Sequence, residues 1–289
     1  MERDVALILN PAAGGGRGLR LLAGVEEWLR SHRIRYRVAR TRDLDHAREL
    51  AQAAAAAGEV AAAFGGDGIV GAVAGALAGA DGVLAVLPGG RANDFARCVG
   101  IPRSPVAACE ALVSGRERRI DLGAVGDRRF VGIASCGIDS DANRIANATR
   151  VPGEAAYLYG ALRALARWRP ARFEIELDGV RVEHVGYNVA AANAPAYGGG
   201  MYLAPGALLD DGLLDVVTVG AVSRARFLRK FPGVFRGSHL RNPEVTLRRA
   251  REVRIAADRP FALYADGDVI AQLPATVRTV PAAVRLLVP

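Results

Sequence analysis

Gly65-Gly66-Asp67-Gly68 follows the apolar run Val60–Phe64 and precedes the Ala-, Gly- and Val-rich segment Ile69–Ala80. This order predicts a buried strand, a tight glycine turn and a helix. Glycines lack a Cβ, so backbone N–H groups can approach a phosphate closely, and the helix N-terminus adds partial positive charge. The Asp67 carboxylate would repel a phosphate unless a cation or a hydrogen-bond network lay between them. These four residues fit a metal-assisted phosphate site and an ordinary strand-to-helix turn equally well.

The same order of elements repeats through the first third of the chain. Strands are expected at Val5–Leu9, Tyr36–Arg40, Val60–Phe64 and Val83–Leu87. The expected helices lie around residues 21–29, 44–57, 69–80, 93–98 and 105–114. Strands that alternate with helices predict an α/β domain with a parallel sheet, whose loops meet at one edge where ligands bind.

After about Ile120 the pattern changes to strand-like runs joined by turns such as Asp178-Gly179 and Asp211-Gly212. The expected strands cover residues 129–135, 173–177, 185–191, 214–219, 252–256 and 260–265, with a helical insertion near 154–168. Such runs predict an antiparallel β domain. We expect domains of residues 1–121 and 122–281, with the last strand, 282–289, as a candidate to complete the first domain.

The composition limits the possible functions. A chain of 289 residues with 51% hydrophobic and 24% charged residues is typical of a globular protein with one large or two modest domains. Lys230 is the only lysine, which excludes a P-loop and a protein kinase, because both need a lysine at another position. Any nucleotide must therefore be held by backbone amides, polar side chains, arginine or metal.

Two further patterns argue against particular kinds of site. Gly66-x-Gly68-x-x-Gly71 satisfies the dinucleotide fingerprint, but the acid expected after the next strand is missing, so NAD-type Rossmann binding is disfavoured. Three cysteines without C-x-x-C spacing, namely Cys98, Cys109 and Cys136, indicate reduced, mostly buried thiols. The charged N-terminus does not resemble a signal peptide, so we expect a cytoplasmic protein.

A formal net charge of +8 favours an anionic partner. Between Arg224 and Arg254, ten basic residues face two glutamates, with three phenylalanines among them, and a second arginine cluster surrounds Trp168. Basic and aromatic residues together suit an anionic membrane surface. The alternative is a set of solvated helix faces that pack their aromatic side chains inward. Nucleic-acid binding is disfavoured, because no known nucleic-acid module accompanies the charge.

Five segments together resemble the diacylglycerol kinase catalytic-domain family, over nearly the whole chain. They are Asn10–Gly14, Gly65–Gly68, Pro88–Arg97, Asp210–Asp215 and Tyr264–Asp268. More narrowly, they are similar to the soluble bacterial lipid kinases, which are related to sphingosine kinases and distantly to NAD kinases. The resemblance implies an α/β nucleotide-binding domain, a C-terminal antiparallel β-sandwich domain for lipid and magnesium, and an active site in the cleft between them.

The resemblance also implies roles for individual residues. The expected catalytic residues are Asp67, Asp121, Asp266 and Asp268, of which Asp266 or Asp268 would be the base. The Asp211 carboxylate and the backbone carbonyls of Leu208 and Leu213 would hold magnesium, which prefers oxygen ligands. The expected ATP-binding residues are Asn10, Pro11, Ala12, Ala13, Gly14, Thr41, Gly65, Gly66, Asp67, Gly68, Ile69, Val70, Gly71, Arg91, Asn93 and Asp94.

The implied function is an ATP- and magnesium-dependent lipid kinase that converts diacylglycerol to phosphatidic acid during transient binding to the inner face of the cell membrane. The alternatives are a kinase for a sphingoid lipid, a glycolipid or NAD, and a pseudokinase with a regulatory role. The last is motivated by departures from the family pattern: Ile69, Gly71 and Ala72 replace polar residues, and Arg91 replaces a small hydroxyl residue. A homodimer remains open.

Overall fold

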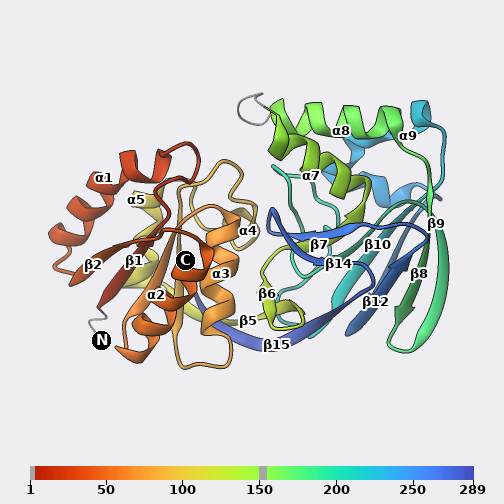
Figure 1. Ribbon diagram of the computed structural model, residues 1–289. Coiled ribbons are helices and arrows are strands. Elements are labelled where there is room, and N and C mark those ends of the chain that lie inside the picture. Colours follow the sequence, from red (N-terminus) through yellow and green to blue (C-terminus); the bar gives the residue numbers. More distant parts are fainter. Residues whose placement is uncertain (1–3, 150–154) are drawn as a thin grey trace. The chain divides into compact units, whose positions relative to one another are not determined.

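The structure is a computed structural model that describes residues 4–149 and 155–289. The chain forms two compact units (Figure 1). The first contains Met1–Leu122, Arg129–Val131 and Val280–Pro289, and the second contains Gly123–Arg128 and Gly132–Thr279. The strands β5 (Arg116–Val125) and β15 (Ala275–Val288) therefore each contribute residues to both units.

The first unit is built on a parallel sheet. Its strands lie in the order β2 (Tyr36–Arg40), β1 (Val5–Leu9), β3 (Val60–Gly65) and β4 (Val83–Pro88), and the end of β15 pairs in parallel with β4. Every residue of β1, β3 and β4 is buried, as expected for strands covered on both faces. The helices are α1 (Arg17–Ser31), α2 (Leu44–Ala56), α3 (Asp67–Leu77), α4 (Asp94–Cys98), α5 (Pro105–Ala108) and α6 (Ala111–Ser114).

The second unit is antiparallel and sandwich-like. Its central strand, β9 (Val180–Ala192), pairs with β8 (Ala171–Leu177) through its first half and with β7 (Ile133–Gly137) and β10 (Leu214–Gly220) through its second half. Strand β8 continues to β12 (Glu252–Ala257), and β10 continues to β11 (Val245–Ala250). Strand β7 continues to β13 (Ala262–Ala265) and β14 (Asp268–Gln272).

The helices of the second unit lie along one end of it in Figure 1. They are α7 (Ile138–Ala148), α8 (Ala155–Arg167) and α9 (Arg224–Lys230), followed by the short helices η1 (Phe231–Arg236) and η2 (Ser238–Arg241). Stacked rings connect helices to strands: Trp168 stacks on Tyr187, and Tyr187 on Phe227, with ring centroids 6.2 and 4.5 Å apart. The aromatic side chains of the basic segment therefore partly pack inward, as one of the two interpretations of its sequence expected.

Several elements differ from the sequence-based expectation. Helix α7 was not expected, because its residues are mostly polar and follow a short buried strand. The expected helix at 105–114 is two short helices, and β9 extends well beyond the expected strand at 185–191. The start of the expected helical insertion, residue 154, lies outside the described residues.

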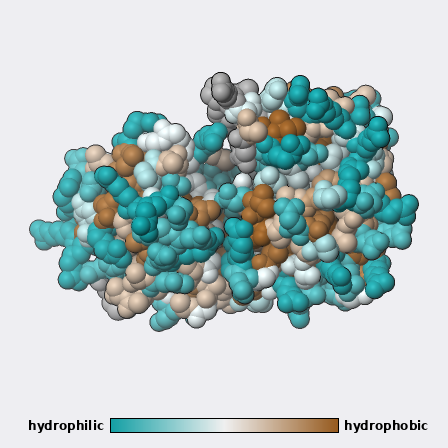
Figure 2. Space-filling view, in the orientation of Figure 1, coloured by the Kyte–Doolittle hydropathy of each residue, from teal (hydrophilic) through white to brown (hydrophobic). Residues whose placement is uncertain are grey.

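The surface of both units is largely hydrophilic, with separate apolar patches (Figure 2). Within residues 4–149 and 155–289, no helix is both long enough and apolar enough to cross a membrane. Cys109 and Cys136 are buried and Cys98 is half-buried, and none of the three forms a disulfide. Burial raises the pKa of the Cys109 and Cys136 thiols to about 12, so both stay protonated at neutral pH.

Candidate functional site

Three glycine-rich loops meet at the carboxyl ends of the parallel strands of the first unit. The Gly65 carbonyl, at the end of β3, accepts hydrogen bonds from the N–H groups of Gly89 and Gly90, at 2.8 and 3.0 Å. A Cβ on Gly90 would overlap the backbone of Gly66. In the loop after β1, a Cβ on Gly14 would lie 2.9 Å from the Gly89 carbonyl oxygen. The structure thus brings together the loop residues that the sequence predicted for nucleotide binding.

Asp67 joins two of these loops. It is the first residue of α3, and its carboxylate oxygens accept hydrogen bonds from the N–H groups of Phe95 and Asp94, at 2.9 and 3.1 Å. The carboxylate therefore caps the start of α4. Burial raises the pKa of Asp67, and the nearby Asp94 raises it further, while the backbone hydrogen bonds act in the opposite direction. The Asp67 carboxylate thus lies in a hydrogen-bond network, which is one of the two ways in which a carboxylate can be accommodated in this turn.

Two asparagines shape the loops through their side chains. Asn93 has a left-handed backbone, with φ of 53°, and its amide both accepts from the Gly90 N–H at 2.9 Å and donates to the Gly90 carbonyl at 3.0 Å. The Asn10 side chain accepts from the Ala12 N–H at 2.9 Å. Arg91, which is exposed, is the charged residue of the Gly89–Asn93 loop.

The first N–H groups of α3 have no partner within the helix, because the helix begins at Asp67. They follow directly after the converging glycine loops. A helix N-terminus of this kind attracts anions. Residues Gly68 and Ile69 therefore offer backbone donors in place of the hydroxyl that Ile69 lacks.

Thr41 and Asp121 have structural contacts in the first unit. Thr41 is buried after β2, and its N–H donates to the Leu9 carbonyl at 2.8 Å. Asp121 is buried on β5, and its Oδ1 accepts from the Ala282 N–H at 2.7 Å. Asp121 thus fixes the C-terminal strand to the first unit.

In the second unit, Asp266 occupies a hairpin turn between β13 and β14. Asp266 and Gly267 have φ values of 51° and 93°, and positive φ at both central residues defines a type I′ turn. The Asp266 Oδ1 accepts a hydrogen bond from the Gly132 N–H at 2.9 Å. A Cβ on Gly132 would lie only 2.6 Å from that oxygen, so a larger residue here would displace the carboxylate. Asp268, by contrast, lies exposed on β14.

Gly132 also binds the segment that leads to the glycine-rich loop 197–201. Its carbonyl accepts from the N–H groups of Asn193 and Ala194, at 3.0 and 3.2 Å. One residue thus connects the Asp266 turn to this loop. Gly132 was missed by the sequence analysis, although an isolated glycine within a strand-like run signals a close backbone approach.

The predicted magnesium loop is compact. The Asp211 Oδ1 accepts from the Leu213 N–H at 3.0 Å, and its Oδ2 lies 3.6 Å from Nη1 of Arg249. Leu208 is half exposed. The described residues contain no group of three or more His, Cys, Asp or Glu side chains that could hold a metal. A cation here would depend on Asp211 and on carbonyl oxygens, a hard donor set that suits magnesium, and a guanidinium already lies beside the carboxylate.

A buried polar cluster near the start of α7 was not predicted. The Asp139 Oδ2 accepts from the Tyr197 hydroxyl at 2.8 Å and from the Asn188 side chain at 3.1 Å. Burial raises the pKa of Asp139, although its hydrogen bonds, including one with Ser135, act in the opposite direction. Burial and the Asp139 charge raise the pKa of Tyr197 well above its ordinary value. The cluster anchors the 197–201 loop to α7.

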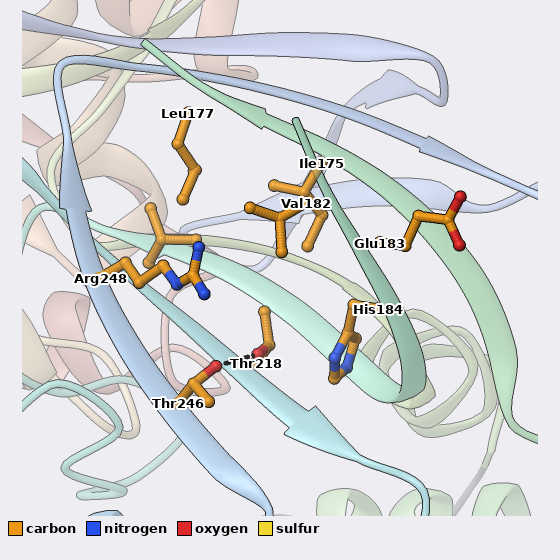
Figure 3. A pocket seen from close by; sticks show the side chains of 9 residues that line it. Ile175, Leu177, Val182, Glu183, His184, Thr218, Thr246 and Arg248 are labelled. Carbon is orange, nitrogen blue, oxygen red and sulfur yellow. Dashed lines mark hydrogen bonds between the residues drawn. The ribbon is translucent and has the colours of Figure 1, made fainter. Parts of the chain in front are cut away.

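A pocket of about 150 Å³ opens between β8–β9 and β10–β11 (Figure 3). Its apolar wall includes Ile175, Leu177 and Val182, and its polar side includes the hydroxyl pair of Thr218 and Thr246, 2.6 Å apart. It contains none of the residues predicted from the sequence. The predicted site residues are thus grouped in the loops of the first unit and in the Asp211 and Asp266 loops of the second.

Comparison with known proteins finds two family matches, of which the second also includes residues 280–288 of the first unit. Residues 4–125 match the diacylglycerol kinase catalytic domain, and residues 132–288 match the YegS C-terminal NAD kinase beta sandwich-like domain.

Individual relatives match over most of their length. A diacylglycerol kinase of Mycobacterium tuberculosis (strain ATCC 25618 / H37Rv) is 36% identical, over 99% of this chain and 95% of the relative. A diacylglycerol kinase of Bacillus subtilis (strain 168) is 32% identical, over 73% of this chain and 72% of the relative. A solved diacylglycerol kinase structure from Bacillus anthracis str. Sterne has the same fold, with a TM-score of 0.76 and 19% identity, over 100% of this chain and 97% of the other.

Proposed function

This chain is a lipid kinase that belongs to the diacylglycerol kinase catalytic-domain family, and from this premise we propose that it transfers the γ-phosphate of ATP, with magnesium, to the primary hydroxyl of diacylglycerol. The acceptor is inferred from the relatives that cover most of the chain and bear the name diacylglycerol kinase. The observation that carries the proposal is the Asp266 carboxylate, which a hydrogen bond from Gly132 holds in a fixed position.

Asp266 acts as the base in this proposal. Its carboxylate takes the proton from the lipid hydroxyl, and the hydroxyl oxygen attacks the γ-phosphorus in line as the bond to the β–γ bridging oxygen breaks. Phosphatidic acid and ADP are the products. Asp266 is favoured over Asp268 because its position is fixed by a backbone donor, whereas Asp268 lies exposed on β14.

The phosphates of ATP are assigned to the converging loops of the first unit. The N–H groups at the start of α3 and the exposed Arg91 supply donors, and no lysine is needed. Asp211, with the carbonyls of Leu208 and Leu213, would hold magnesium, which when bound supplies positive charge against the phosphate oxygens. Asp67 keeps the two loops in register through its bonds to Asp94 and Phe95.

Transfer of phosphate from radiolabelled ATP to lipid is the direct test of this function. With Mg²⁺ and mixed micelles, we expect a labelled product with diacylglycerol and weaker or no labelling of a sphingoid base, a glycolipid or NAD. Labelling of another acceptor alone would reject diacylglycerol as substrate. ATP binding without transfer to any acceptor would reject the kinase and favour the pseudokinase alternative.

The lipid substrate requires access to a membrane, and α8 offers a suitable surface. Leu158, Tyr159 and Leu162 are 59%, 40% and 48% exposed, and the Arg163 guanidinium lies 5.8 Å from the centre of the Tyr159 ring. Figure 2 shows an apolar patch among hydrophilic side chains over the α7 and α8 helices. Exposed apolar side chains beside arginine are typical of an interfacial helix on an anionic membrane.

The basic segment after β10 extends this surface. Leu228 on α9 and Phe235 on η1 are each 47% exposed, and α9 carries Arg229 and Lys230 in its last turn. The Arg224 guanidinium donates to the Trp168 carbonyl at 3.0 Å, which connects the start of α9 to the residue after α8. We assign both helices to transient binding at the inner face of the cell membrane, from the cytoplasm.

Sedimentation with phosphatidylglycerol vesicles tests this assignment. We expect a Leu158→Asn/Leu162→Asn double variant to lose binding, whereas Val180→Asn, which removes a 63% exposed apolar side chain elsewhere on the same unit, should bind like the wild type. Equal binding of all three proteins would remove α8 from the membrane surface.

A further inference from the structure

Arg249 makes three contacts with the segment that contains the predicted magnesium loop. It lies on β11, directly opposite Asp215 on β10. Its Nε is 3.0 Å from the Asp215 Oδ1, its Nη2 donates to the Gly206 carbonyl at 3.4 Å, and its Nη1 is 3.6 Å from the Asp211 Oδ2. One guanidinium therefore reaches both ends of residues 206–215 and the carboxylate in the middle.

The contacts differ in strength. Asp215 is 4% exposed, so its carboxylate needs a charged partner, and the bond with Nε is a charge-assisted hydrogen bond. The distance to Asp211 is too long for a hydrogen bond. Arg249 therefore hydrogen-bonds Asp215 and forms only a longer ion pair with the Oδ2 of Asp211.

The loop has its own internal support, which is local. The Asp211 Oδ1 accepts from the Leu213 N–H two residues further on, and this bond shapes the turn around Gly212. It does not fix the turn relative to the rest of the unit. Arg249 does so from a different strand, because a planar guanidinium can bind several acceptors at once, which lysine cannot do in the same way.

We propose that Arg249 is a positioning residue of the metal loop: it holds Gly206 and Asp215 so that Asp211 and the carbonyls of Leu208 and Leu213 stay arranged for a divalent cation. This inference rests on the proposed function of the loop as the magnesium site. Arg249 is not a ligand and does not contact substrate. Its effect is on the affinity of the loop for the cation, because mutation of residues that orient metal ligands typically weakens metal binding.

The neighbouring Arg248 provides a matched control. It lies one position earlier on β11, so its side chain points to the opposite face of the strand. Its side chain lines the pocket together with Leu177 and Thr246 (Figure 3). Arg248→Gln removes the same charge from the same strand without touching residues 206–215, so it separates the loss of a specific contact from a general change in charge.

The experiment titrates the full chain with Mn²⁺, a paramagnetic substitute for Mg²⁺, and measures free Mn²⁺ by electron paramagnetic resonance. We expect Arg249→Gln to weaken Mn²⁺ binding by about tenfold to a hundredfold, and Arg248→Gln to leave it unchanged. Arg249→Lys, which can still pair with Asp215, should give an intermediate loss. In kinase assays, Arg249→Gln should need more Mg²⁺ for half-maximal rate and recover most of its kcat at saturating Mg²⁺.

Equal affinity of Arg249→Gln and Arg248→Gln would overturn the proposal, and so would tighter binding by Arg249→Gln, which would make Arg249 a competitor of the cation. Asp211→Asn distinguishes a failure of the premise. If Asp211→Asn binds Mn²⁺ like the wild type, the loop is not the metal site, and this proposal falls with it. If only Asp211→Asn loses binding, the metal loop stands and the role of Arg249 is rejected. Thermal unfolding verifies that each variant folds.

Discussion

Two Asp-Gly turns of the second unit have the same local structure but different surroundings. Asp178-Gly179 joins β8 to β9 with φ values of 48° and 88°, and Asp266-Gly267 joins β13 to β14 with φ values of 51° and 93°. Both are type I′ hairpin turns, for which Asp-Gly is a preferred sequence. The backbone and the dipeptide therefore do not distinguish a turn from a candidate catalytic site.

The partners of the two carboxylates do distinguish them. Asp178 is exposed, and its carboxylate accepts from the N–H groups of Arg251 and Glu252, at 2.8 to 3.1 Å, where β12 begins. Asp266 is half-buried, and one of its oxygens is held by Gly132, where a side chain would clash. The first arrangement fastens a hairpin to the next strand. The second holds a carboxylate at a fixed point, as a base requires.

The largest expected effect comes from replacing the two aspartates in turn. Asp266→Asn should lower kcat by about two to four orders of magnitude, the usual range for a general base, and leave ATP affinity largely intact. Asp178→Asn should leave kcat unchanged and lower the free energy of unfolding by about 1 kcal/mol, because hydrogen bonds to the carboxylate are weakened.

Phosphate transfer from labelled ATP and urea unfolding measure the two quantities for each variant. Asp268→Asn completes the set and should retain most of the activity. A wild-type rate for Asp266→Asn, or a comparable loss of kcat in Asp178→Asn, would remove the functional distinction between the turns.

A smaller effect is expected when the partner of Asp266 changes. Gly132→Ala would place a Cβ 2.6 Å from the Asp266 Oδ1, so the carboxylate must move. A displaced base should lower kcat by up to about a hundredfold, with KM for ATP little changed. Gly24→Ala on α1 serves as a control, since its Cβ would meet only a methyl group of Val106, at 3.3 Å. Full activity of Gly132→Ala would show that the Gly132 contact does not position the base.

The glycines of the two turns form a third, closely matched pair. A Cβ on Gly179 or on Gly267 would meet nothing within 4 Å, and both residues have positive φ. Alanine at either position should therefore lower the free energy of unfolding by a similar amount, about 1 to 2 kcal/mol, from backbone strain alone. Thermal unfolding measures this cost. Only Gly267→Ala should also lower kcat, and equal activities would weaken the assignment of Asp266.

The smallest effect concerns Asp139, a carboxylate that is enclosed, unlike those of the turns. Burial raises its pKa in the folded chain above the unfolded value, which is about 3.9 for an ordinary aspartate. The folded state then binds more protons in this window, so the contribution of Asp139 to stability falls as pH rises from the unfolded to the folded pKa. The stability difference between wild type and Asp139→Asn, from urea unfolding across this range, should decrease with pH. A stability difference that increases with pH would contradict a raised pKa for Asp139.

The first unit was predictable because its strands are short, and β1, β3 and β4 are buried and apolar throughout. Val5–Leu9 and Tyr36–Arg40 occur as expected, and β3 and β4 each extend one residue further. Parallel strands with covered faces read as continuous apolar runs, and the turn residues that follow place the loops. The convergence of the predicted nucleotide loops follows from that topology.

The second unit was less predictable, because its important contacts join residues far apart in sequence. Gly132 and Asp266 meet through neighbouring strands, and Arg249 reaches Asp215 only because β10 and β11 pair. Among so many arginines, nothing in the sequence marks Arg249. The polar helix α7 was also missed, since Asp139 is buried against Tyr197 and Asn188 rather than against apolar side chains.

The final strand has a consequence for how the chain can be made. Residues Val280–Pro289 belong to the first unit, β15 pairs with β4, and Asp121 binds the N–H of Ala282. During translation, the first unit must wait for residues 280–289, which follow the whole second unit, before its sheet is complete. An expressed fragment that ends at Leu122 would expose the edge of β4, an edge that invites aggregation. Adding residues 280–289 as a separate peptide should restore its solubility.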